Sequence, residues 1–373
     1  MPRWLLFTAC IIIAALAGWS FWRALPAPAA PLADPIVITQ TGSVSGTNLI
    51  AIDPVMRTED YASTGAFTAR LADYLEAARE AGVLTPRTVA VFPEHVGTWL
   101  VATDAPRGVY RAASVEGAMT ALIAANPLPF AGSVLASPEA DRAAAAVFRM
   151  RSADMAERYQ AAFSALAEDY GITLVAGSVV LAGARIEDGR IVTANDGPLE
   201  NVSAVFAPDG SVHGALVRKV YPIPSEAGFT AAATLEDYPV FNTPAGRLGV
   251  LICADSWHPD VYAALEGADL LAVPAFLQPG GVWDQPWGGY VTPWPDDVPR
   301  EDAGRLSEGE AWQTHALAGR LQDSSARAGV TAFLGGSLWG MESDGAAIAV
   351  DADGVHAARR TTGGEILVMW VSG

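Results

Sequence analysis

The chain has 373 residues, of which 51% are hydrophobic and 9% aromatic, so it can bury a large core and is not an intrinsically disordered protein. Its formal net charge of −18 argues against nucleic acid as a partner, because an acidic chain cannot neutralise a phosphate backbone. The length suits one large domain or two ordinary ones.

The first 23 residues predict a targeting segment. Residues 4–22, WLLFTACIIIAALAGWSFW, carry no charge, and as a helix they would extend about 28 Å, close to the hydrocarbon thickness of a bilayer. We interpret residues 1–23 either as a transmembrane signal anchor, with membrane contact through residues 4–22, or as a signal peptide that is cleaved. Both interpretations export the rest of the chain, which is then membrane-anchored and periplasmic, or secreted after cleavage. Residues 24–35, rich in Pro and Ala, predict an extended linker.

Residues 36–373 predict one α/β domain in which strands and helices alternate. A first helix is predicted by apolar residues at helical spacing, namely Phe67, Leu71, Tyr74, Leu75 and Ala78. A second follows Ser152 as its N-cap and ends at Gly171, and a third covers residues 310–327. Buried strands are predicted at residues 47–52, 88–93, 172–180, 248–253, 270–276 and 365–370.

Two stretches, near residues 95–151 and 277–310, are longer than the loops of a compact domain usually are. Part of the first, residues 114–125, has a helical pattern. The second contains three tryptophans among many Pro and Gly residues, which favours an ordered lid over a disordered loop. We expect both insertions to shape a substrate entrance.

Three reactive side chains, Glu94, Lys219 and Cys253, each stand at the end of a predicted strand, where ligand sites of α/β proteins gather. Taken singly, each has an ordinary explanation, as a solvated carboxylate, an exposed cation or a buried core thiol. Cys253 is the only cysteine beyond residue 10, so the exported part holds no disulfide partner for it. The five histidines show no metal-ligand spacing, and we expect no metal site.

The segments around these residues, VAVFPE, RKVYPIPSE and GVLICADSWHPDVYAALEGADLLAVPAF, resemble in this order the three catalytic blocks of the nitrilase (carbon-nitrogen hydrolase) superfamily. The resemblance spans about residues 48–353. It implies a four-layer α-β-β-α sandwich, no cofactor, a small-molecule amide substrate and a homodimer formed through an outer helical layer. Two features depart from the family: His95 stands where no histidine is required, and the third helix lacks the arginine-alanine-acid pattern often found there.

By this resemblance Cys253 is the nucleophile, Lys219 the cation that stabilises the oxyanion, and Glu94 the general acid and base. The triad predicts a carbon-nitrogen hydrolase that cleaves non-peptide C–N bonds of linear amides or nitriles through a thioester on Cys253. Two alternatives remain open. One is an N-acyltransferase that uses the same triad on a lipid or lipoprotein amine, and the other is a catalytically silent binding domain.

The resemblance also assigns three substrate-positioning residues. Glu226 matches a second glutamate that orients the lysine and positions the substrate. Ala254 supplies a backbone N–H to the oxyanion, and Trp257 matches an aromatic position beside the pocket. Asp255 matches an acidic residue that holds the loop in place.

Overall fold

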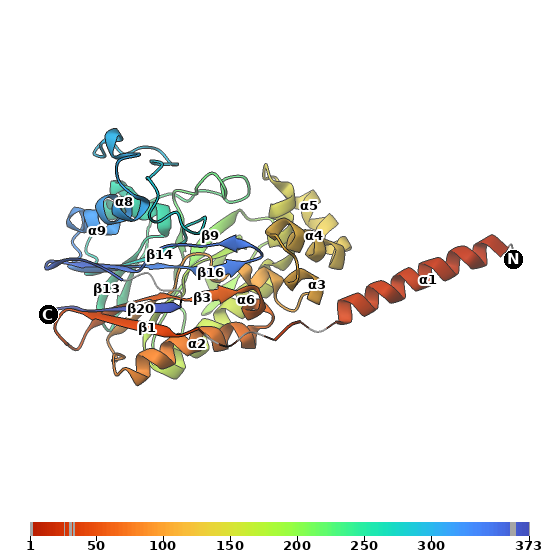
Figure 1. Cartoon of the computed structure of the whole chain (residues 1–373), viewed down its shortest axis with the longest axis horizontal. Coiled ribbons are helices and arrows are strands. Elements are labelled where there is room, and N and C mark those ends of the chain that lie inside the picture. The colour runs from red at the N-terminus through yellow and green to blue at the C-terminus, as the bar shows by residue number, and fades with distance from the viewer. Residues whose placement is uncertain (1–2, 26, 30–31, 33, 359–362, 373) are drawn as a thin grey trace.

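Two six-stranded sheets form the centre of the fold, which the computed structural model describes for residues 3–25, 27–29, 32, 34–358 and 363–372 (Figure 1). The strand order of the first sheet is β1 (Ile36–Thr41), β20 (Gly364–Trp370), β2 (Asn48–Asp53), β4 (Thr88–Val91), β5 (Thr173–Val175) and β10 (Val205–Phe206). The order of the second sheet is β12 (Val240–Thr243), β13 (Gly246–Val250), β14 (Leu270–Ala275), β15 (Ala328–Phe333), β18 (Ile348–Asp351) and β19 (Gly354–Ala357).

Three neighbouring strands in each sheet run parallel: β2, β4 and β5 in the first, and β13, β14 and β15 in the second. Parallel strands end at the same edge of their sheet, so the loops that follow them gather there. Three smaller sheets complete the set: β6 (Val179–Ala182) with β9 (Leu199–Ser203) and β11 (Val217–Arg218), β3 (Val55–Arg57) with β16 (Gly335–Leu338) and β17 (Met341–Glu342), and β7 (Arg185–Glu187) with β8 (Arg190–Val192).

Helices cover the outer faces of both sheets (Figure 1). The α-helices are α1 (Arg3–Ala24), α2 (Thr64–Glu80), α3 (Arg107–Tyr110), α4 (Val115–Ala125), α5 (Pro127–Ala136), α6 (Arg142–Tyr170), α7 (Pro259–Ala264), α8 (Glu308–His315) and α9 (Leu317–Arg320). Short 3₁₀ turns are η1 (Thr58–Tyr61), η2 (Thr98–Ala102), η3 (Cys253–Trp257), η4 (Arg300–Asp302) and η5 (Leu321–Asp323).

The side chains of β2 point alternately to the two faces of the first sheet, and this explains how the layers of the fold are arranged. Leu49 and Ala51 pack into the core between the two sheets, whereas Ile50 and Ile52 pack into the core beneath α2 and α6. A strand can be fully buried in this way because successive side chains point to opposite faces. On the far side, Trp312 of α8 and Leu317 of α9 join the core of the second sheet. The layers therefore follow the order helices, sheet, sheet, helices, in a mixed α/β fold.

Two predicted helix boundaries are wrong. The second helix begins at Arg142 with Asp141 as its N-cap, and Ser152 instead lies inside it, buried, with its hydroxyl accepting a hydrogen bond from the Ala182 N–H at 2.8 Å. Gly171 does end the helix, with φ of +62°. The predicted helix over residues 310–327 breaks at Ala316, whose ψ of −156° is extended. The Arg320 guanidinium donates to the freed His315 carbonyl at 2.9 Å, so the break is stabilised by a side-chain contact that helical periodicity does not reveal.

The two insertions differ in structure. Residues 95–151 are mostly helical, with η2, α3, α4, α5 and the start of α6, whereas residues 277–310 contain only η4 and the first residues of α8 as helical elements. Trp283 and Trp287 of the second insertion are nonetheless buried. This insertion is thus a packed layer over the edge of the second sheet.

Helix α1 projects away from the sheets (Figure 1). The structure does not describe the side chains of residues 4–10 and 12, Cys10 among them, nor residues 26, 30, 31 and 33 of the predicted linker. Among the side chains that it does describe, no single helix has the length and apolar character needed to cross a membrane. Helices α4 and α5, which meet at 107°, reach that length and composition only as a pair.

Candidate active site

The structure brings Glu94, Lys219, Glu226 and Cys253 into one buried cluster. The Lys219 ammonium lies 2.7 Å from Glu94 Oε1 and also bonds the Glu226 carboxylate. The Cys253 thiol lies 3.8 Å from the carbonyl oxygen of Phe276, and the charges of Glu94 and Lys219 both act on its pKa. None of the four residues is more than 5% exposed. A buried charge needs partners of opposite sign, and here each charged group has at least one.

Three members of the cluster each follow the end of a strand, as the sequence predicts, whereas Glu226 lies in the loop between β11 and β12. Glu94 stands three residues beyond β4, Lys219 directly follows β11, and Cys253 begins η3 after β13. Strands β4 and β13 belong to different sheets, so the cluster forms where the two sheets face each other. The distance along the chain between its members reflects this: Glu94 and Lys219 are separated by 125 positions.

Two further residues hold the glutamates: Asn201, which the sequence does not single out, and His95, which the sequence marks as a departure from the family that either tunes the Glu94 carboxylate or caps a loop. The Asn201 amide donates to Glu94 Oε1 at 2.9 Å and to Glu226 Oε1 at 3.0 Å. The His95 ring places Nε2 at 3.0 Å from Glu226 Oε1 and Nδ1 at 3.0 Å from the Thr98 hydroxyl. The one sequence signal for Asn201 is an amide side chain within the strand LENVS, because a buried polar residue in a strand requires a partner.

The charges of the cluster favour a protonated thiol in the resting enzyme. Burial raises the pKa of the Cys253 thiol, the Glu94 carboxylate raises it further, and Lys219 lowers it. Burial alone would lower the pKa of Lys219, but Glu94 and Glu226 hold it well above its ordinary value. Burial alone would raise the pKa of Glu226, but Lys219 and His95 hold it below its ordinary range.

The turn that begins at Cys253 is strained and held by several hydrogen bonds. Cys253 has φ of +51°, a left-handed conformation that costs a non-glycine residue on the order of 1–2 kcal/mol. Asp255 accepts hydrogen bonds from the backbone N–H groups of Val220 and Tyr221, which directly follow Lys219. The Ser256 hydroxyl donates to the Cys253 carbonyl at 2.7 Å. These bonds hold Cys253 in its strained conformation and fix its position relative to Lys219.

A cavity of about 450 Å³ opens in front of Cys253. Ala254 and Trp257 of η3, two of the three residues expected to position the substrate, line it. Much of the remaining wall comes from the 277–310 insertion and from α8, through residues that include Val282, Trp287, Tyr290, Thr292, Glu308 and Trp312. The walls are mainly aromatic and aliphatic, so they suit an apolar part of a small molecule.

Glu94, His95 and Glu226 could also present one ligand atom each to a metal ion, because these atoms lie within 4.8 Å of one another. The Lys219 ammonium already bonds both carboxylates. A metal ion would therefore compete with Lys219 for the same oxygens.

The model of the carbon-nitrogen hydrolase family matches residues 63–291, a range that contains Glu94, Lys219 and Cys253. The chain belongs to the carbon-nitrogen hydrolase family. This membership also places it in the nitrilase superfamily, in agreement with the order of the three sequence blocks. A curated Schizosaccharomyces pombe protein named as a probable nitrilase is 37% identical over 73 residues, 19% of this chain. That match spans only 26% of the length of the yeast protein.

Solved structures with a similar fold belong to the same group of enzymes. A cysteine-to-serine variant of the Nesterenkonia AN1 amidase from the nitrilase superfamily has a TM-score of 0.51 at 16% identity, covering 88% of this chain and 92% of its own. A carbon-nitrogen hydrolase from Helicobacter pylori G27 has a TM-score of 0.50 at 18% identity, covering 87% and 90%. At these identities the likeness shows the fold alone, and the mixed α/β architecture is that of the superfamily.

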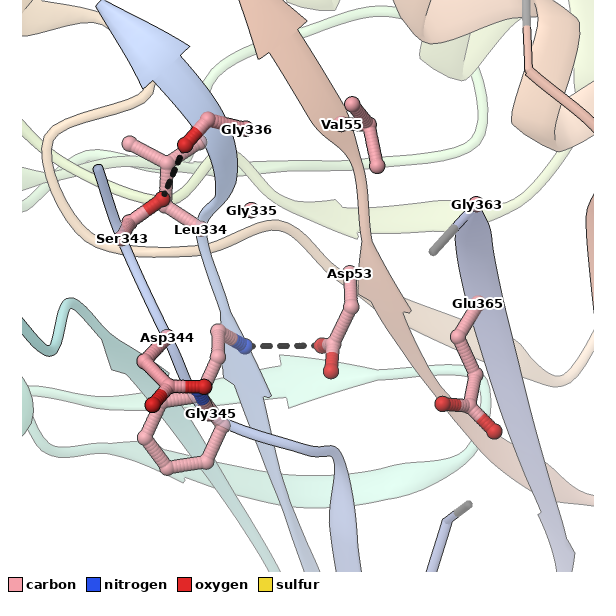
Figure 2. Close-up of a pocket in the computed structure, with 11 residues that line it drawn as sticks. Asp53, Val55, Leu334, Gly335, Gly336, Ser343, Asp344, Gly345, Gly363 and Glu365 are labelled. Atoms are coloured by element: carbon pink, nitrogen blue, oxygen red, sulfur yellow. Dashed lines mark hydrogen bonds between the residues drawn. The ribbon is translucent and has the colours of Figure 1, made fainter. Parts of the chain in front are cut away.

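A second cavity, of about 190 Å³, lies at the same edge of the sheets and is lined by Asp53, Asp344 and Glu365 (Figure 2). Asp53 accepts a hydrogen bond from the Phe333 N–H at 2.7 Å and so joins β2 of the first sheet to β15 of the second. Burial raises the pKa of Asp53, and the nearby Glu365 raises it further despite that hydrogen bond. No cysteine or lysine is among the described residues that line this cavity, which we interpret as part of the seam between the sheets.

Proposed function

We propose that this carbon-nitrogen hydrolase cleaves the C–N bond of a small non-peptide amide through a thioester on Cys253. The observation that carries the proposal is a buried cluster in which the Lys219 ammonium bonds the Glu94 carboxylate, both groups act on the pKa of the Cys253 thiol, and Cys253 lines an apolar cavity. A nucleophile, a proton carrier and a cation are the groups that acyl transfer from an amide requires.

The first half-reaction transfers the acyl group to sulfur. Glu94 takes the thiol proton as Cys253 attacks the carbonyl carbon, and the negative charge that develops on oxygen is stabilised by the Lys219 ammonium and the Ala254 N–H. Glu94 then gives its proton to the nitrogen, the C–N bond breaks, and a neutral amine leaves. The raised pKa of the thiol fits this order, since the proton moves only when the substrate carbon is in place.

The second half-reaction releases the acid. Glu94, again a carboxylate, accepts a proton from water as the water oxygen attacks the thioester carbon, and the same oxyanion groups stabilise the intermediate. The C–S bond then breaks, the thiolate regains the proton from Glu94, and a carboxylic acid leaves. Three neighbouring side chains take no part in the bond changes and keep Lys219 and Glu94 in position, namely Glu226, His95 and Asn201.

An N-acyltransferase is the second candidate, in which an amine replaces water in the second half-reaction. The apolar wall of the cavity supports it, because such a wall also suits a fatty acyl chain. Product analysis separates the two: incubation with amides or phospholipid plus an amine acceptor yields a new amide for a transferase and free acid for a hydrolase.

We also propose that residues 4–22 anchor the enzyme in a membrane, with the catalytic domain outside the cytoplasm. The uncharged run itself supports this, together with α4 and α5. No charged residue occurs between Glu116 and Glu139, and Leu128 and Leu135 of α5 are 84% and 89% exposed. The Trp19 indole donates a hydrogen bond to the Ala124 carbonyl at 3.1 Å, which places α4 beside α1. We expect the full chain to stay in the membrane fraction after alkaline carbonate extraction. We also expect protease added to spheroplasts to digest the catalytic domain. Recovery of the protein in the cytosolic fraction would contradict the proposal.

Intact-mass analysis tests the proposed chemistry. The protein is mixed with a panel of aliphatic and aromatic amides and nitriles, quenched in acid within seconds, and weighed. We expect the protein mass to increase by the mass of the acyl group for at least one amide. The Cys253→Ala variant should show neither this increase nor turnover. Turnover that persists in Cys253→Ala would overturn the proposal.

A further inference from the structure

One carboxyl group in the substrate cavity has no part in the proposed chemistry. Glu308 is the first residue of α8 and lines the same cavity as Cys253 and Trp257. Within the described part of the chain, no lysine, arginine or histidine forms an ion pair with it. A carboxylate that faces a mainly apolar cavity without a cation is costly, so its presence there requires an explanation.

The start of α8 does not supply that explanation. The Ser307 hydroxyl caps the helix by accepting a hydrogen bond from the Glu310 N–H, and the Glu310 carboxylate accepts one from the Ser307 N–H. This reciprocal pair completes the capping box without the Glu308 side chain. A helix N-terminus also favours ionised carboxylates. Burial nevertheless raises the pKa of Glu308 to about 7, although the Trp312 indole partly offsets this. The desolvation of Glu308 therefore outweighs the stabilisation that its own helix provides.

The wall around Glu308 is aromatic. Trp312 meets Trp257 edge to face, with ring centroids 4.9 Å apart. Trp257 in turn stacks on Trp287 at 5.7 Å and meets Tyr290 edge to face at 5.5 Å. The negative faces of such rings attract cations, and an aromatic wall with one carboxylate is a recurring way to bind an ammonium group. The net charge of −18 also draws cations toward the protein.

We propose that Glu308 and the aromatic wall bind a cationic group of the substrate, so that the enzyme prefers amides in which an apolar spacer joins the scissile carbonyl to an ammonium or guanidinium group. This inference rests on the proposed amide hydrolysis at Cys253. Bound there, the cation supplies the partner that the Glu308 carboxylate lacks, while the spacer packs against the tryptophans.

Matched substrates test the preference. Amides ending in a trimethylammonium group are compared with neutral isosteres ending in tert-butyl, in one series with the group on the acyl side and in another with it on the amine side. We expect kcat/KM to favour the cationic member about tenfold in one series, the ratio that a single ion pair or cation–π contact provides. Glu308→Gln should lower the ratio about tenfold. Glu301→Gln removes an exposed carboxylate of the same insertion and should leave the ratio unchanged.

The outcomes separate the two proposals. If short neutral amides are hydrolysed but neither series shows a cationic preference, or if Glu308→Gln keeps that preference, the cation site is wrong and the hydrolase stands. If no amide acylates Cys253, the proposed function fails, and binding still tests the cation site. Calorimetry on Cys253→Ala with benzyltrimethylammonium should then show binding that Glu308→Gln weakens about tenfold, and equal affinity or no binding would overturn the inference.

Discussion

Asp255 accepts a hydrogen bond from the Tyr221 N–H at 2.8 Å, and this contact joins the turn of Cys253 to the segment that follows Lys219. Asp255 is fully buried, two residues after Cys253, and has no side-chain cation as a partner among its hydrogen bonds in the described structure. Its backbone donors therefore fix the geometry of the site and only partly compensate the loss of hydration.

The pH dependence of stability should reveal this carboxyl group. Burial raises the pKa of Asp255 to about 7, although the bonds from Tyr221 and Val220 lower it. Between the ordinary pKa of an aspartate and pH 7 the folded protein holds a proton that the unfolded chain has released, so the group destabilises the fold as pH rises. Asp255→Asn removes that titration. We expect the Tm of wild type minus that of Asp255→Asn to fall from pH 4 to pH 8 in thermal melts. A constant difference would show that Asp255 is ionised throughout.

Glu94→Gln should uncouple thiol reactivity from turnover. The Glu94 charge raises the pKa of the Cys253 thiol and Lys219 lowers it, so removing the charge leaves the lysine effect unopposed. We expect the apparent pKa for alkylation by iodoacetamide to fall while amide turnover falls more than 10²-fold, because the proton carrier is lost. Intact mass after timed labelling gives the rate, and Cys253→Ala corrects for Cys10. Slower alkylation of Glu94→Gln at every pH would instead show that Glu94 is needed to ionise the thiol.

Asn201→Leu tests the bridge between the two glutamates. The substitution keeps the size of the side chain but removes donors to Glu94 and Glu226, and a hydrogen bond to a charged group contributes about 1.5–3 kcal/mol. We expect kcat to fall about 10- to 100-fold, with a Tm lower by several degrees. Asn242→Leu, at an exposed position of β12, is the matched control and should change neither. An unchanged kcat in Asn201→Leu would mean that Lys219 and His95 hold the carboxylates without Asn201.

The difference between what sequence predicted and what it missed follows from the range of the interactions. The strands and the chemistry at their ends depend on local patterns, so Glu94, Lys219 and Cys253 could be selected as candidates from the chain alone. Asn201 bonds Glu94, which lies 107 positions earlier in the chain, and Glu226, which lies 25 positions later. No local pattern encodes such a pairing. The break at Ala316 likewise depends on the tertiary contact of Arg320, and the start of α6 on capping by Asp141 rather than by the equally plausible Ser152.

His258 should have the opposite effect to Asp255 over nearly the same pH range. Its ring stacks on Tyr221, with centroids 3.6 Å apart, and its Nε2 lies 2.8 Å from the hydroxyl of Thr292 in the insertion that walls the cavity. Burial lowers the pKa of His258 to about 4, and Asp260 only partly opposes this. Below the ordinary pKa of histidine the unfolded chain therefore takes up a proton that the folded protein excludes, and stability is lost as pH falls from about 6.5 to 4.

His258→Gln keeps a side chain that can bond Thr292 but removes the titration. We expect the Tm of wild type minus that of His258→Gln to rise from pH 4 to pH 7, the reverse of the slope expected for Asp255→Asn. In wild type the two titrations oppose each other, so only the single variants expose them. Hydrogen exchange of residues 277–310, corrected for intrinsic rates, is the second measurement. In wild type the exchange should accelerate as His258 becomes protonated near pH 4. In His258→Gln it should not accelerate. Equal exchange in both proteins at pH 4 would show that His258 does not hold the insertion against the turn of Cys253.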